Sequence, residues 1–214
     1  MGIKEFIPFF KEEKKEIVDK RDELRTLQDR IKIYDLIVGR YREYIEKNEA
    51  KTITGLKSLV RPNDEAIQKK KEEIIEEMKL RPYIYDSHFL KAADGAHKFI
   101  MEIRKYILPV DFWLTSKELI DIGGGDPMDK AVFLCSLLVA LENQESYVIV
   151  GIDKGIKVAV GFVYNNEFYI MDPASASRAK GEKEKLIMDW FKDDRKIYEF
   201  NDRDYSEIKS EETE

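Results

Sequence analysis

The chain has 214 residues, of which 43% are apolar and 37% are charged, and its 43 acidic and 37 basic side chains give a net charge of −6. The apolar share is large enough for a folded core, and charges of mixed sign give no electrostatic case for binding nucleic acid. One cysteine and two histidines exclude an internal disulfide framework and leave little material for a metal centre. No apolar run reaches the roughly 18–20 residues of a membrane helix, so we expect a cytoplasmic protein that holds no cofactor and contacts no membrane.

The first 50 residues predict one long amphipathic helix. Residues 11–49 contain no proline and only one glycine, and apolar residues recur at two positions of a seven-residue repeat. Such a repeat with charged flanks is typical of a coiled coil, here about 57 Å long. The predicted seam consists of Ile17, Leu24, Leu27, Ile31, Tyr34, Val38, Tyr41 and Ile45. We expect the seam to bind a protein partner or a second copy of the chain, and the alternative is a helix that packs on its own domain.

The residues after this helix predict a domain that begins with helices. The expected segments are an irregular linker over 51–61 and helices over 64–80 and about 87–106. His88 and His97 lie nine residues apart on the last of these helices, a spacing that matches no local metal site. Both histidines are therefore expected to be ordinary helix residues.

From Tyr147 onward the apolar pattern changes to a period of two. Three short strands are expected, SYVIVGI, IKVAVGFVY and EFYIM, joined by tight turns at the sequences Lys-Gly and Asn-Asn. These strands form an antiparallel meander, and a helix near 182–193 and a strand over 196–200 complete the domain. Helices first and strands afterwards predict an α+β fold.

The last residues of the chain are its most acidic part. Residues 199–214 contain seven acids and two bases, and the final sequence SEIKSEETE has almost nothing to bury. We therefore expect residues 201–214 to form a mobile acidic tail that aids solubility. The chain as a whole has 26 lysines and 25 glutamates against 3 glutamines, a composition typical of thermophile proteins.

Residues 112–141 carry the strongest local signals in the sequence. Ser116 or Thr115 can cap a short helix that ends at three consecutive glycines, Gly123 to Gly125. The glycine run is not a phosphate-binding P-loop, because the pattern G-x-x-x-x-G-K-[ST] is absent.

A second helix is expected over 126–141. Asp126 can cap it, Pro127 takes the first helical position, and Asp129 falls in the first turn. The residues that follow are almost all apolar, so we expect this helix to pack against the antiparallel sheet.

The nucleophile segment of the transglutaminase-like superfamily resembles residues 112–141, FWLTSKELIDIGGGDPMDKAVFLCSLLVAL. In that superfamily, whose members are papain-like in fold, the segment usually reads W-x-[ST]-P-x-E-x-L, a short spacer, G-G-D-C-x-D-K-A and L-L-A-S-L-L. LKSLVRPNDEAI resembles a V-x-P-N-D-P segment of archaeal and bacterial members, and AVGFVYNNEFYIMDPAS resembles H-A-W-V-E-V, a turn and W-Y-x-L-D-P-[TS]. The resemblance covers about residues 56–200 and implies helices packed on an antiparallel sheet.

The resemblance also implies a catalytic triad, most of which is missing here. Members place a cysteine at the helix start, a histidine on a facing strand and an aspartate on the next strand, because a helix N-terminus stabilises a thiolate and the histidine accepts its proton. In this sequence the cysteine position is Pro127, the histidine position is Lys157 or Val158, and the aspartate position is Asp172. We therefore expect no catalytic residue, and Cys135 is expected to be a small core residue.

These expectations together describe a non-catalytic, transglutaminase-like protein. The predicted organisation is a coiled-coil helix over 1–50, a transglutaminase-like domain over 51–200 and an acidic tail over 201–214. The expected function is protein binding or scaffolding, in which the helix binds itself or a partner and the vestigial groove holds an extended peptide. Two alternatives remain open: a cysteine-protease-like or acyl-transferase-like enzyme of non-standard chemistry, and a purely structural subunit of a larger assembly.

Overall fold

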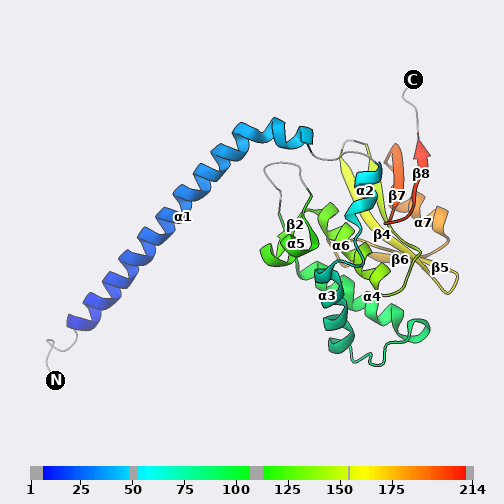
Figure 1. Ribbon diagram of the computed structural model, residues 1–214, viewed down its shortest axis with the longest axis horizontal. Coiled ribbons are helices and arrows are strands. Elements are labelled where there is room, and N and C mark those ends of the chain that lie inside the picture. Colours follow the sequence, from blue (N-terminus) through cyan, green and yellow to red (C-terminus); the bar gives the residue numbers. More distant parts are fainter. Residues whose placement is uncertain (1–6, 49–52, 107–112, 154, 211–214) are drawn as a thin grey trace. The chain divides into compact units, whose positions relative to one another are not determined.

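The computed structural model describes residues 7–48, 53–106, 113–153 and 155–210. Helix α1, Ile7–Asn48, belongs to one unit of the structure, and the other described elements form a second unit (Figure 1). The 42 residues of α1 form one helix, which confirms the long N-terminal helix; its pairing in a coiled coil stays a prediction. In the part of the chain that is described, no helix combines the length and the apolar character needed to cross a membrane.

The second unit has a mixed architecture of helices and strands, which confirms the α+β class. Its helices are α2 (Ile53–Leu59), α3 (Glu65–Glu77), α4 (Tyr85–Glu102), α5 (Ser116–Ile122), α6 (Pro127–Ala140) and α7 (Lys183–Trp190). Two short parallel strands pair with each other, β1 (Arg104–Lys105) and β2 (Gly124–Gly125). Local signals set several of these elements: the Asp64 carboxylate caps α3 by accepting a hydrogen bond from the Ala66 backbone N–H at 2.8 Å.

Six strands form one fully antiparallel sheet in the spatial order β6-β5-β4-β3-β7-β8. The strands are β3 (Ser146–Ile152), β4 (Ile156–Tyr164), β5 (Glu167–Met171), β6 (Arg178–Gly181), β7 (Lys196–Phe200) and β8 (Tyr205–Ser210). Asn165 and Asn166, with φ of 51° and 61°, form the two-residue turn between β4 and β5. Asparagine tolerates this left-handed conformation, so the predicted hairpin is confirmed.

Helix α6 is the centre of the larger hydrophobic core. Every residue from Met128 to Ala140 is buried, because α6 packs against α3 and α4 on one side and against β3 and β4 on the other. A helix that is apolar on all its faces can only be stable in such a position. Asp126 caps α6 as expected, and the prediction of one helix packed on an antiparallel sheet is confirmed.

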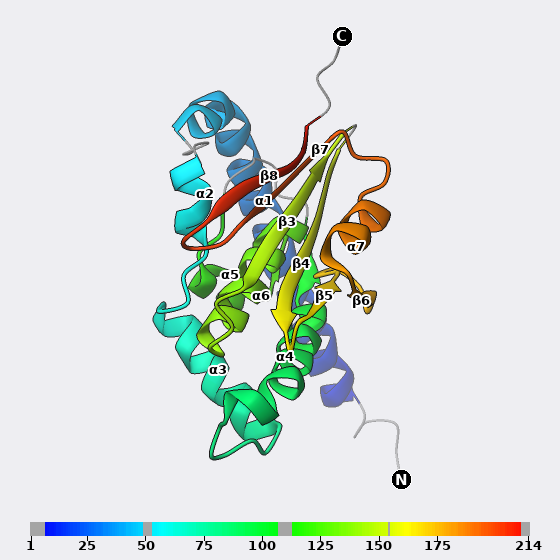
Figure 2. The same cartoon turned by 90° about the vertical axis from the view of Figure 1, so that its right-hand side faces the viewer.

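The opposite face of the sheet carries a smaller core. Helix α7 packs on β5 and β6, and its Ile187 and the following Phe191 are buried with residues of β3, β4, β5 and β7 (Figure 2). Strand alternation sends neighbouring residues of β4 to different cores: Val160 and Phe162 face α6, and Ala159 faces α7. The sheet is therefore covered by helices on both faces.

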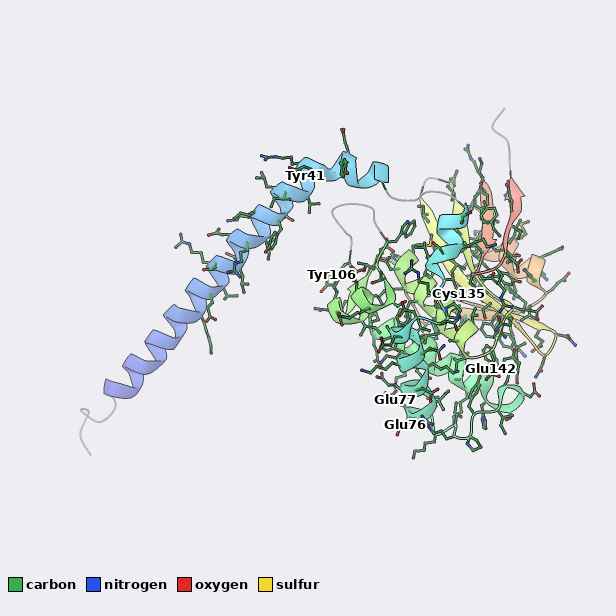
Figure 3. The ribbon with its side chains drawn as sticks, viewed as in Figure 1. Tyr41, Glu76, Glu77, Tyr106, Cys135 and Glu142 are labelled. Carbon is green, nitrogen blue, oxygen red and sulfur yellow. The ribbon has the colours of Figure 1, made fainter. Side chains whose placement is uncertain are left out.

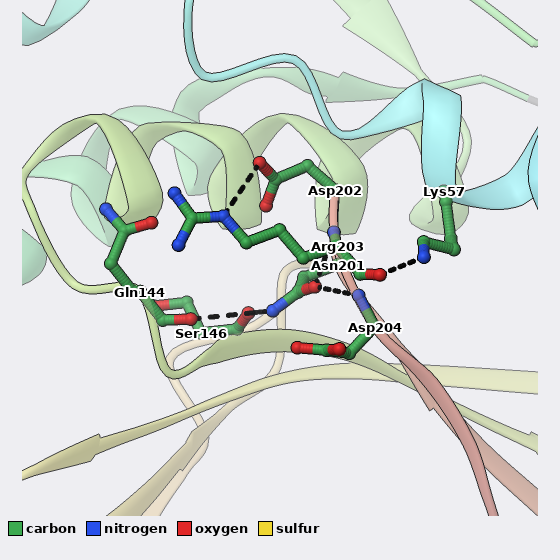
Figure 4. A network of polar contacts seen from close by, with 7 residues as sticks. All are labelled: Lys57, Gln144, Ser146, Asn201, Asp202, Arg203 and Asp204. Carbon is green, nitrogen blue, oxygen red and sulfur yellow. Dashed lines mark hydrogen bonds and ion pairs between the residues drawn. The ribbon is translucent and has the colours of Figure 1, made fainter.

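The turn between β7 and β8 is fixed by the buried Asn201 (Figure 4). The Asn201 side-chain amide donates to the Ser146 carbonyl at 3.2 Å, and its Oδ1 accepts from the backbone N–H groups of Arg203 at 2.8 Å and Asp204 at 2.7 Å. The Lys57 ammonium also donates to the Arg203 carbonyl, which joins α2 to this turn. One buried side chain thus satisfies three backbone groups that a tight turn leaves open.

Three expectations about secondary structure need correction. Residues 205–210 form strand β8, so a mobile tail over 201–214 is wrong for residues 201–210; residues 211–214 lie outside the described part of the chain. Residues 53–59 form helix α2 where an irregular linker was expected. Strands β1, β2 and β6 were not expected, and β6 extends the meander to a fourth consecutive strand.

Candidate functional site

The start of α6 is the position at which the resemblance implies chemistry. Asp126 Oδ1 accepts a hydrogen bond from the Asp129 N–H at 2.8 Å, and Asp129 Oδ2 accepts one from the Asp126 N–H at 3.1 Å. This reciprocal arrangement is a capping box. Proline suits the first helical position because a backbone N–H at that position would have no acceptor within the helix, so its absence costs no hydrogen bond. Pro127 is half-exposed and carries no group that could act as a nucleophile.

Asp129 holds this helix start against the segment before α5. Its Oδ1 accepts a hydrogen bond from the Leu114 N–H at 3.1 Å. The pKa of Asp129 is raised from 3.8 to about 6, chiefly by burial and next by the nearby Asp126 carboxylate, although the backbone hydrogen bonds act to lower it. The two carboxylates are therefore committed to backbone N–H groups, which is a structural role.

The two candidates for the histidine position lie on opposite faces of the sheet. Lys157 places its ammonium 3.3 Å from Oδ2 of Asp194, which is buried beside α7. Val158 is half-buried and packs against the larger core, on the α6 side. Only Val158 thus lies on the same face of the sheet as α6, and its side chain can neither accept nor donate a proton.

Asp172 directly follows β5, and its carboxylate is used within its own turn. Oδ1 accepts from the Ala174 N–H at 2.7 Å, and Oδ2 accepts from the Ser175 hydroxyl at 2.8 Å. The Asp172 carbonyl oxygen accepts a hydrogen bond from Nε2 of His97 at 2.7 Å. A carbonyl oxygen only accepts, so Nε2 carries the proton, and the contact fixes the end of β5 on α4.

His97 and Lys130 are the polar residues near Asp172 that sequence reasoning missed. Both are buried, and the Lys130 ammonium donates to the Ile103 carbonyl at 2.9 Å. Burial lowers the pKa of Lys130, and the negative charge of Asp172 opposes that shift. The sequence did contain one signal for these two residues, because each is a charged or imidazole side chain on an otherwise apolar helix face. Burying such a side chain is stable only when it has a hydrogen-bond or ion-pair partner on another element.

The remaining cysteine and histidine do not join this cluster. Cys135 is fully buried on α6, two turns beyond Pro127, and burial raises the pKa of its thiol well above the ordinary value (Figure 3). Nδ1 of His88 accepts a hydrogen bond from the Ile84 N–H at 3.1 Å at the start of α4. Among the described residues, no group of three or more histidine, cysteine or acidic side chains is placed to hold a metal ion.

At least two cavities are bordered by described residues of the second unit. One, of about 430 Å³, borders the end of β5 and is lined by Leu90, Asp94, Tyr169, Ile170, Met171, Arg178, Ala179 and Lys180. The other, of about 480 Å³, lies between α3 and α5 and is lined by Asp64, Glu65, Ala66, Lys69, Lys70, Glu73, Lys117, Ile120 and Asp121. The first includes Met171, the residue before Asp172.

The predicted seam of α1 is open to solvent in the single chain. Leu24, Leu27, Ile31, Tyr34 and Tyr41 are between 52% and 62% exposed, and Val38 is half-exposed (Figure 3 labels Tyr41). The side chains of Ile17 and Ile45 lie outside those described. An apolar stripe of this length is far more surface than a monomeric protein normally leaves in water.

A scan of protein-family models and searches of curated proteins and of solved structures find no match for this chain. Its function is therefore argued from its own residues.

Proposed function

We propose that this chain is a non-catalytic, transglutaminase-like protein with a papain-like fold that binds or scaffolds other proteins. The observation that carries the proposal is the proline at the first position of α6. In this superfamily the helix start supplies the thiolate, and a proline there supports the helix and removes the nucleophile. The long helix α1 is the part that associates with itself or docks on a partner.

The arrangement around α6 supports the family assignment. A capped, apolar helix lies on an antiparallel sheet, β4 and β5 are neighbours in that sheet, and an Asp-Pro sequence follows β5. A histidine could reach the start of α6 only from the α6 face of β4, so Val158 is its counterpart and Lys157 is not. With Pro127 and Val158 at these positions, neither a nucleophile nor a general base is available.

The enzyme alternative has one observation in its favour, the contact between His97 and Asp172. That contact uses the backbone carbonyl of Asp172 and comes from α4, whereas a triad needs the carboxylate to orient the imidazole. The nearest hydroxyl, Ser175, donates to Asp172 Oδ2 and has no described hydrogen bond to His97. Cys135 is buried and its thiolate is disfavoured, so it offers no replacement nucleophile.

The cavity between α4 and the β5–β6 hairpin is where we propose that an extended peptide binds. It lies beside the edge strand β6, whose outer backbone groups can pair with an added strand. Arg178 of β6 pairs with Asp94 of α4, and Lys180 pairs with Glu167 at 2.8 Å. A vestigial groove of this kind can keep its shape after the catalytic groups are lost.

Two measurements test the proposal. Iodoacetamide should label Cys135 only after the full-length protein is unfolded; rapid labelling of the native protein would support the enzyme alternative. Sedimentation of the full chain should give a multiple of the 25.2 kDa chain mass. The double variant Ile31→Asp, Val38→Asp should sediment at a lower mass than the wild type, because it places two charges in the seam.

The matched control for the seam variant is Arg25→Glu. It changes the net charge by the same two units at an exposed position outside the seam. It should leave the mass unchanged. A wild-type monomer, or a seam variant that sediments like the wild type, would refute self-association through α1.

A further inference from the structure

The described part of α1 exposes more apolar surface than a two-stranded coiled coil can cover. Nine of its large apolar side chains are between 47% and 70% exposed, and only five of them belong to the predicted seam. The other four are Ile33, Leu36, Ile37 and Tyr44. These four all lie in the C-terminal half of the helix, so this half has an apolar surface that the first seam leaves unexplained.

The additional residues define a second seam. The first seam advances by steps of three and four residues through Leu24, Leu27, Ile31, Tyr34, Val38 and Tyr41. A second series with the same steps runs through Tyr34, Ile37, Tyr41 and Tyr44, so the two seams share Tyr34 and Tyr41. At about 100° per residue, the apolar side chains from Ile33 round to Ile31 span an arc about 160° wide, whereas a two-stranded coiled coil needs only a narrow stripe.

We propose that α1 forms a parallel bundle of at least three copies of this chain, in which each α1 contacts one neighbour through the first seam and another through the second. The inference rests on the proposed function, because it specifies how many copies associate through α1 and in which orientation. With two neighbours, each helix buries both sides of the arc, and Tyr34 and Tyr41 lie at the centre between them. Ile31 and Val38 are the β-branched residues that a two-stranded coiled coil favours at the first seam position, but Tyr34 and Tyr41 replace the leucines that it favours at the alternate position.

Further copies of the chain fit this surface better than the chain's own second unit does. That unit exposes six large apolar side chains among its described residues, and they are divided among four elements and turns. They are Ile84 and Met101 at the two ends of α4, Ile122 at the end of α5, Ile152 and Ile156 at the β3–β4 turn, and Met188 on α7. By contrast, the nine exposed apolar side chains of α1 lie on one helix and form a single large apolar surface, which is the kind of surface that marks a protein–protein interface.

The charges beside the first seam favour parallel helices in register. Arg30 precedes the seam residue Ile31, and Asp35 follows the seam residue Tyr34. In a parallel coiled coil these two flanking positions face each other on neighbouring helices, so Arg30 of one copy meets Asp35 of the next. In an antiparallel pair the position of Arg30 faces the equivalent position of the other helix, and the position of Asp35 does the same. Arg30 and Asp35 then do not meet, so they give no attraction between the helices.

Sedimentation equilibrium of the full-length protein measures the number of copies directly. We expect at least three times the 25.2 kDa chain mass. The double variant Ile33→Lys, Ile37→Lys places charges in the second seam and beside it and leaves the first seam intact, so it should reduce the assembly to a dimer. Glu43→Lys makes the same change of two charge units at an exposed position outside both seams and should keep the wild-type mass.

The outcomes separate this inference from the proposed function. A wild-type dimer would overturn the bundle and leave self-association through α1 standing. A wild-type monomer would overturn both, and it would mean that another surface covers α1. An unchanged mass for Ile33→Lys, Ile37→Lys would show that the second seam contacts no other copy.

The orientation has its own test. The variant Leu27→Cys places a thiol in the first seam, and mild oxidation should link two copies through it, because parallel helices in register bring the same residue together. Cys135 is fully buried and does not compete in the native protein. An assembly of three or more copies that gives no interchain disulfide would overturn the parallel arrangement alone.

Discussion

The variant Pro127→Cys introduces a cysteine at the position where the resemblance implies a nucleophile, without introducing a base, and we predict that its thiol stays unreactive. The new side chain would lie at the first position of α6, between the carboxylates of Asp126 and Asp129 that form the capping box. The fold should tolerate the change, because the first helical turn prefers proline without requiring it. The effect to measure is therefore on the thiol and not on stability.

The charges at this helix start decide the pKa of that thiol. The helix dipole places about half a positive charge at the N-terminus and favours a thiolate by about 0.3–1 kcal/mol. Asp126 and Asp129 place two full negative charges in the same turn at pH 7, and each opposes the thiolate by roughly 1 kcal/mol if it lies near 4 Å in water and by more in a partly buried site. Val158, the residue proposed for the histidine position, carries no positive charge that would stabilise the thiolate. The pKa of the thiol should therefore lie at or above the ordinary value of about 8.5.

The rate of alkylation by iodoacetamide between pH 6 and pH 9 measures this pKa. The matched control is Ser116→Cys, also at the first position of a helix, where the neutral Thr115 is the cap and Glu118 is the only acidic residue of the first turn. We expect the control thiol to ionise at lower pH than the thiol of Pro127→Cys. A thiol at position 127 with a pKa below about 7.5, or any turnover of an activated ester by this variant, would refute the argument.

Three further predictions concern the elements that hold the site. Burial raises the pKa of Asp129 to about 6 in the folded chain. Between about pH 4 and pH 6 the folded chain therefore keeps a proton on Asp129 that the unfolded chain has released. As the pH rises through this range, the contribution of Asp129 to the free energy of unfolding should fall by about 2–3 kcal/mol in all. Urea unfolding at pH 4 and pH 7 should show this loss for the wild type and not for Asp129→Asn. Lys157→Ala leaves the buried carboxylate of Asp194 without its ion pair and should lower the free energy of unfolding by about 1 kcal/mol, since the lysine is half-exposed. Asn201→Ala removes three buried hydrogen bonds and should cost about 2–3 kcal/mol, with loss of hydrogen-exchange protection in β8.

The parts of the fold that could be predicted are those with strong local signals. The cap, proline and apolar run of α6 specify a helix without reference to the rest of the chain, and the period of two with asparagines at the turn specifies β4 and β5. The same holds for α3, which begins at a capping aspartate. In each case propensity, pattern and turn chemistry agree, which is the condition under which local reasoning works.

The elements that could not be predicted depend on tertiary contacts. The sequence of β8 is charged and has few apolar side chains to bury, so it gives no local signal for a strand. The strand forms because Asn201 fixes the turn before it and β7 supplies its hydrogen-bond partners. Helix α2 has only seven residues, too few to be stable alone, and Lys57 joins it to the β7–β8 turn. For α2 this partner lies 146 positions away, which no local window contains.

The candidate site shows the same division. The start of α6 could be located from its cap and from the resemblance, but the choice between Lys157 and Val158 needs the register of β4, because a shift of one residue moves a side chain to the other face of the sheet. The contact between His97 and Asp172 joins α4 to the end of β5 and was invisible for the same reason. Spacing along the sequence could not distinguish a buried structural histidine from an exposed one.

The residues at the triad positions stabilise the fold in ways that catalytic residues would not. Proline suits the first position of α6, whereas a thiolate there would face two carboxylates that already cap the helix. Val158 packs against the larger core, where an imidazole would need a polar partner. Asp172 keeps a role because its carboxylate holds its own turn, independent of any histidine. These three residues thus have structural roles in the fold. The large exposed apolar surface of α1 among the described residues is the feature through which the proposed association can be tested.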